Sequence, residues 1–108
     1  MAKASGRVVV EIGLPRLSDE QVVKVVEAAE RAAREYVLSV LPAKKVYDIG
    51  ISVQAEGEVP LTITVDIELR VASSARVDPD ELAKEAAKKA LEAAEAKLRE
   101  LALVGRGA

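Results

Sequence analysis

The sequence predicts an α+β fold with the order β-α-β-β-α, in which a three-stranded antiparallel sheet (order 1-3-2) carries two helices on one face. Three segments have the β-branched or alternating pattern of strands, and two longer segments have apolar residues at helical spacing. At 108 residues and 50% apolar composition, one domain with its own core is expected. We assign residues 7–104 to that domain, 1–6 to a disordered N-terminus and 105–108 to a frayed tail.

The first strand and first helix are separated by a short break. Residues 7–12 read RVVVEI, a β-branched run that is ended by Gly13 and Pro15. Ser18 and Gln21 then have the spacing of a capping box, in which each side chain binds the other residue's backbone amide. Apolar residues recur at helical spacing until Pro42, which ends the helix.

Two alternating segments and a long helix complete the chain. Residues 47–54 alternate with period two, and residues 61–71 alternate more strongly, which indicates a sheet that is covered on one face only. Asp78 is the expected N-cap of the second helix, with Pro79 at its first position, and the helix runs to about Val104.

The predicted topology places the first strand at an edge of the sheet. A right-handed crossover joins the first and second strands in parallel, and the third strand lies between them, as in a split β-α-β arrangement. An apolar edge is a liability unless it is short, covered or paired with another chain. Apolar residues also occupy a wider part of each helix surface than packing against one sheet requires. The candidate interface therefore comprises Val8, Val9, Val10, Val22, Val23, Val26, Ala83, Ala87, Ala90, Ala94, Leu98 and Leu101.

A simpler interpretation of the helix faces stays open. Alanine is the best helix former and fills intermediate positions for that reason alone, and a solitary exposed valine is common. Association through helix faces and association through the first-strand edge are both kept as alternatives.

The composition excludes most catalytic chemistry. The chain has no His, Cys, Trp or Phe and only two tyrosines, so it lacks the residues that supply most general bases, nucleophiles, transition-metal ligands and base-stacking platforms. We expect no enzymatic activity, no cofactor and no metal. Asp48, Asp66 and Glu68 share the polar sheet face, where they could bind a cation or act as acid and base, but a solvated face is the favoured interpretation. The basic pairs at 44–45 and 88–89 have the same two interpretations, phosphate contact or solvated charge.

Charge and hydropathy bear on nucleic-acid binding and on cellular location. A formal net charge of -2 argues against a protein that binds nucleic acid alone, so any contact with tRNA would be indirect. No apolar run is long enough to span a membrane, and zero cysteine fits a reducing compartment, so a cytoplasmic location is expected. Few amide side chains together with 31% charged residues are typical of thermophile proteins; a designed protein without function is the alternative.

Four stretches together carry a family resemblance: VVVEIGLPRLSDEQ, VYDIGISV, LTITVDIELRV and VDPDELAKEAAKKALEAAEAKLREL. They resemble a small archaeal family of unknown function that is often encoded beside a prefoldin subunit. That family in turn looks like the Pcc subunits of the archaeal KEOPS complex, which makes the threonylcarbamoyl modification of tRNA. The resemblance implies a small, non-catalytic, dimerising subunit that pairs with Pcc or with itself.

Three functions are therefore carried forward. The first is a non-catalytic assembly or regulatory subunit of a KEOPS-type complex. The second is a co-chaperone or adaptor linked to prefoldin or translation. The third, an RNA-binding module, is disfavoured by the charge balance and by the scarcity of aromatic residues, of which the chain has two.

Overall fold

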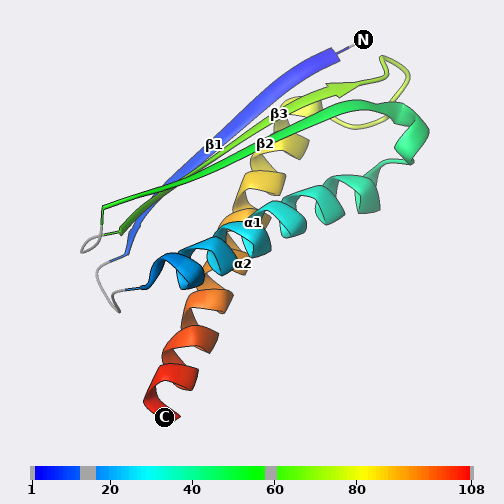
Figure 1. Ribbon diagram of the computed structural model, residues 1–108. Helices are drawn as coiled ribbons and strands as arrows, with labels where there is room; N and C mark the ends of the chain where they lie inside the picture. Colours follow the sequence, from blue (N-terminus) through cyan, green and yellow to red (C-terminus); the bar gives the residue numbers. More distant parts are fainter. Residues whose placement is uncertain (1, 13–16, 58–60, 108) are drawn as a thin grey trace.

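The computed structural model describes residues 2–12, 17–57 and 61–107, without the side chains of residues 12 and 102–107. The elements follow the predicted order and confirm the fold class (Figure 1). They are β1 (Ala2–Ile12), α1 (Asp19–Val40), the short 3-10 helix η1 (Ala43–Lys45), β2 (Val46–Glu56), β3 (Leu61–Val71) and α2 (Pro79–Gly107).

The three strands form one antiparallel sheet in the order β1-β3-β2. Val65 in the middle of β3 lies between Val8 of β1 and Val53 of β2. Because both outer strands are antiparallel to β3, they run parallel to each other, as the crossover through α1 requires. The predicted order 1-3-2 is confirmed, and β1 and β2 are the two edges of this sheet.

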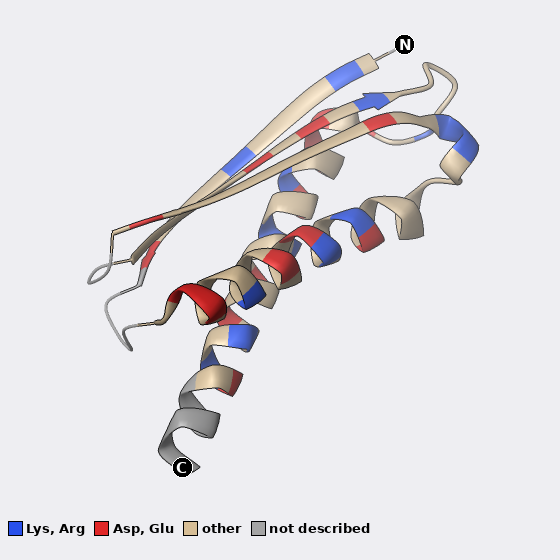
Figure 2. Ribbon diagram, viewed as in Figure 1, with Lys and Arg blue, Asp and Glu red and all other residues tan. Residues whose placement is uncertain are grey.

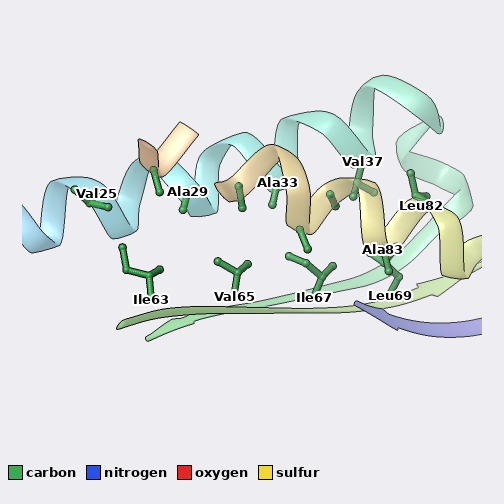
Figure 3. Packing of buried hydrophobic residues seen from close by; sticks show 14 of the residues in the cluster. Val25, Ala29, Ala33, Val37, Ile63, Val65, Ile67, Leu69, Leu82 and Ala83 are labelled. Atoms are coloured by element: carbon green, nitrogen blue, oxygen red, sulfur yellow. The ribbon is translucent and has the colours of Figure 1, made fainter. Parts of the chain in front are cut away.

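Both helices cover the same face of the sheet (Figure 1). Alternate residues of β3 from Leu61 to Val71 are buried on that face, which is the period-two burial expected for a sheet covered on one side. Figure 3 shows Val25, Ala29 and Ala33 of α1 above this row of β3 side chains. Within the described residues no helix lies on the opposite face of the sheet (Figure 1), and most side chains on that face are polar.

The helix N-termini are capped as predicted. The Ser18 hydroxyl accepts the Gln21 amide at 3.3 Å, and the Gln21 side chain accepts the Ser18 amide at 2.9 Å. The carboxylate of Asp78 accepts the Asp80 amide at 2.9 Å in the first turn of α2. These bonds satisfy amides that have no partner within the helix, and so fix where each helix begins.

Both predicted chain ends were wrong in part. β1 begins at Ala2, so residues 2–6 belong to the sheet rather than to a disordered segment. The eleven residues of β3 offer backbone partners along this whole length, down to the pairing of Ala2 with Val71. The helical backbone of α2 continues through Gly107, beyond the predicted end near Val104. Met1, Ala108 and the predicted breaks at 13–15 lie outside the described residues.

Candidate functional site

The alanine face of α2 is buried inside its own chain. Ala83, Ala87, Ala90 and Ala94 are 0% exposed, and Leu98 is 6% exposed. The prediction that these five positions face a partner is therefore wrong for this fold. The helix packs against both the sheet and α1, so its wide apolar surface has two neighbours within the chain. Leu101 is half-buried and packs against the same core.

Small side chains let α2 approach β1 very closely. A Cβ atom added to Gly6 would lie 2.7 Å from both the backbone carbonyl carbon and the carbonyl oxygen of Ala83. Gly6 therefore permits a contact between strand and helix backbone that any side chain would obstruct. On β1, the residues that share this face are Ala2, Ala4 and Gly6, followed by Val8 and Val10. Their alternation with polar residues was the sequence signal that could have extended the predicted strand.

The candidate residues of α1 divide between core and surface. Val22 and Val26 are half-buried, whereas Val23 is 52% exposed. Leu38 and Val40, near the other end of the helix, are also exposed. Single exposed apolar residues of this kind are ordinary at a protein surface, and they do not by themselves mark an interface.

The outer edge of β1 is the predicted site that stays accessible. Val8 and Val10 point toward the helices and are half-buried, while Val9 points to the open face and is 56% exposed. The ladder between β1 and β3 has no register shift, and the strand AKASGRVVVEI contains no proline. Such a strand presents a straight row of backbone groups to the outside.

The opposite edge of the sheet is irregular. The pairing of β2 with β3 shifts register between Val46 and Asp48, and the intervening Tyr47 is 59% exposed. The period-two alternation predicted for residues 47–54 places Tyr47 on the same face as Ile49, and the register shift removes Tyr47 from that alternation. A bulge bends a strand and interrupts its edge, which disfavours further pairing. Of the two edges, β1 is the better template for another strand.

The open face of the sheet carries charges of both signs, as Figure 2 shows along the strands. Arg7 binds Asp66 through Nε at 3.0 Å, and Glu68 lies on the same face. A shallow depression of about 650 Å³ lies over these residues and is also lined by Ser5 and Ser52. Among the described residues, no group of three or more acidic, His or Cys side chains is placed to hold a metal ion.

Three of the four lysines in the predicted basic pairs contact acids or a hydroxyl of their own chain. Lys88 and Lys89 form ion pairs with Glu85 at 3.5 Å and Glu92 at 3.7 Å. The ammonium of Lys45 donates to the Ser74 hydroxyl at 2.7 Å. Acidic and basic residues are interspersed along the ribbons of α1 and α2 (Figure 2), and neither helix is predominantly basic over its described residues. In the described part of the chain, no helix is long and apolar enough to cross a membrane.

The sequence matches a known family and several of its members. A family model described as a protein of unknown function (DUF3194) matches residues 14–97. The uncharacterized protein TK0644 of Thermococcus kodakarensis is 37% identical over 95% of this chain and 95% of its own. The uncharacterized protein PH0533 of Pyrococcus horikoshii is 32% identical over 89% of this chain and 83% of its own. These relatives confirm the expectation of an archaeal, thermophilic family.

Two solved structures have the same fold. A crystal structure from Thermococcus onnurineus NA1 superposes with a TM-score of 0.73 at 38% identity, covering 91% of this chain and 95% of the other. The solution structure of the hypothetical protein mth677 from Methanothermobacter thermautotrophicus has a TM-score of 0.68 at 22% identity, covering 82% and 97%. At that lower identity the likeness concerns the fold alone.

Proposed function

The chain belongs to the DUF3194 family, and we propose that it is a non-catalytic assembly or regulatory subunit of a KEOPS-type tRNA-modification complex. In this proposal it acts in the cytoplasm by pairing with a Pcc-type subunit or with a second copy of itself. The observation that supports association is the open, unbroken outer edge of β1. An edge of this kind binds another strand through backbone hydrogen bonds.

The side-chain chemistry supports a non-catalytic role. With no His or Cys in the sequence, the polar groups on the open face are carboxylates, hydroxyls, basic side chains and the Gln54 amide, and Asp66 already binds Arg7. The net charge of -2 supports contact with tRNA only through the other subunits. The proposal needs no cofactor and no metal.

We propose a KEOPS-type complex in particular because the sequence resembles Pcc subunits. The order β1-α1-β2-β3-α2 is the order that those subunits share. A small chain that offers one sheet edge is suited to control how many copies of a larger complex assemble, because it occupies an edge that would otherwise recruit a like subunit.

Two neighbouring proline substitutions test the β1 edge. In an antiparallel ladder the backbone groups of successive residues point alternately toward the partner strand and away from it. Of Val8→Pro and Val9→Pro, one therefore removes an amide that binds β3 and the other removes an amide at the outer edge. The outward variant should fold normally and lose its partner, and thermal unfolding identifies which variant that is.

The partner is identified by co-expression with Pcc-type and Kae-type subunits, followed by affinity purification and measurement of mass by light scattering. We expect the unmodified chain to be recovered with the Pcc-type subunit and the outward proline variant to be recovered alone. Recovery of prefoldin or ribosomal proteins from cell extract in place of KEOPS subunits would favour the adaptor function instead. Equal recovery of the unmodified chain and the outward variant would refute association through β1.

A further inference from the structure

The open-face side chains of β1 have a self-complementary order. They read Lys3, Ser5, Arg7, Val9 and Glu11 along the strand, so an exposed valine has a basic residue on one side and an acidic residue on the other. Reversing this order about Val9 exchanges the positions of Arg7 and Glu11. A second copy of β1 that runs antiparallel to the first therefore meets opposite charges.

We propose that a second copy of this chain binds at the β1 edge, with the two β1 strands antiparallel about a two-fold axis at Val9. This inference rests on the proposed role of that edge in association. Val9 then lies opposite Val9 of the second copy, and each Arg7 lies opposite a Glu11. Because the interface is isologous, the Arg7–Glu11 contact occurs twice, and the two sheets join into one.

The side chains on the helix face agree with this register. Val8 of one copy lies opposite Val10 of the other, and both residues already pack at the margin of the core. The paired strands would therefore extend the apolar layer beneath the sheet. Val9, which is 56% exposed in the single chain, would be covered by its counterpart on the open face.

Other two-fold registers fit less well. An axis at Arg7 places the two Arg7 side chains opposite each other and sets Val9 against Ser5. An axis at Ser5 places Lys3 opposite Arg7. Like charges that lie directly opposite destabilise a strand pair, so the axis at Val9 is the register that pairs opposite charges without such a conflict.

The two charged groups are available for a contact between copies. Arg7 is 66% exposed and binds Asp66 through Nε, which leaves the other guanidinium donors for a second carboxylate. Glu11 is exposed, and no ion pair to it is found within the described residues. The edge thus combines a backbone template with side chains that select a like strand.

A cysteine cross-link tests the register directly, since the chain has no cysteine of its own. In the proposed pair the two Val9 Cα atoms lie about 4.5–5.5 Å apart, within the range that a disulfide spans. Val9→Cys should therefore give a covalent dimer rapidly on oxidation with diamide. The control is Ser5→Cys on the same face, where the two Cα atoms would be about 26 Å apart. Equal cross-linking rates for the two variants would overturn the register.

Charge reversal gives an independent test in solution. Arg7→Glu alone creates two contacts between carboxylates, and Glu11→Arg alone creates two contacts between guanidinium groups. Each variant by itself should raise the dissociation constant of the dimer about tenfold or more. An equal mixture of the two variants restores both opposite-charge contacts and should form a 1:1 heterodimer.

Sedimentation equilibrium over a concentration series measures these associations, and circular dichroism verifies that each variant is folded. A mixture that associates no better than its components would refute the proposal. The result is separable from the proposed function: a chain that binds a Pcc-type subunit but fails both tests would retain the assembly role and lose the homotypic register. A chain that passes both tests but recruits no KEOPS subunit would retain the homotypic register and lose the assembly role.

Discussion

The inner face of β1 and its outer edge belong to one strand, yet they have opposite surroundings. On the inner face, Gly6 lies against the backbone of Ala83, and the alanine face of α2 is fully buried. At the outer edge, the backbone faces outward along an unbroken strand, and Val9 is exposed. The first region is specified by side-chain volume and the second by backbone hydrogen bonding. Substitutions should therefore affect stability in one region and association in the other.

The largest effect is expected from a charge on the buried alanine face of α2, which packs beneath the sheet. Ala90→Glu places a carboxylate at a position that is 0% exposed, among apolar neighbours. An unpaired buried charge costs several kcal/mol, comparable to the whole stability of about 5–15 kcal/mol typical of a domain. We expect unfolding rather than the folded monomer that an exposed interface would give. Circular dichroism measures the loss of helical structure, and urea titration measures the free energy of unfolding.

Ala96→Glu is the matched control, because Ala96 lies on the exposed side of the same helix. Substitutions at such positions change stability by about 0.5 kcal/mol or less. A folded, soluble Ala90→Glu variant with a urea midpoint close to that of Ala96→Glu would contradict the packing of α2 described above.

Close approach of strand and helix gives the next largest effect. A methyl group at Gly6 meets backbone atoms of Ala83 at 2.7 Å, and backbone moves less readily than a flexible side chain. Gly6→Ala should lower the free energy of unfolding by about 1–3 kcal/mol, as overpacking does. Denaturant unfolding checks this value.

Gly50 provides the comparison for Gly6. A Cβ atom there would lie 3.6 Å from the Glu68 Cβ, which is an ordinary contact. Gly50→Ala should be neutral or stabilise by about 0.4–1 kcal/mol, because it reduces the freedom of the unfolded chain. If the two glycines respond alike, close packing does not distinguish the two sheet positions.

The contrast between face and edge explains which sequence predictions succeeded. The presence of three strands and the two helix starts depend on local patterns, such as the capping box at Ser18 and the alternation from Leu61 to Val71, and the structure confirms them. The order 1-3-2 follows from the handedness of the crossover and is also confirmed. Burial of Ala83 and Ala90 depends on how closely two elements approach. That distance is set in three dimensions by residues far apart in sequence, so helical spacing alone could not assign the alanine face to the core or to a partner.

The start of β1 was missed for a related reason. Ala2, Ala4 and Gly6 have low strand propensity, and their period-two pattern is inconspicuous because the side chains are small. The reason for their small size is visible only in the folded chain, where the backbone of α2 lies close to Gly6. Glu11 was also missed as a candidate contact, although the period-two alternation of the predicted strand 7–12 already places it on the same face as Arg7.

The smallest effect is expected from the ion pair beside the open edge. Arg7 and Asp66 are 66% and 37% exposed, so water and salt screen their interaction. A double-mutant cycle with Arg7→Ala and Asp66→Ala should give a coupling energy of about 0.2–1 kcal/mol that decreases with added salt. Stability is measured by denaturant titration at a protein concentration where the chain is monomeric, so that association does not contribute. A coupling above about 2 kcal/mol, insensitive to salt, would place this pair among the determinants of the fold and would erase the contrast between the packed face and the open edge.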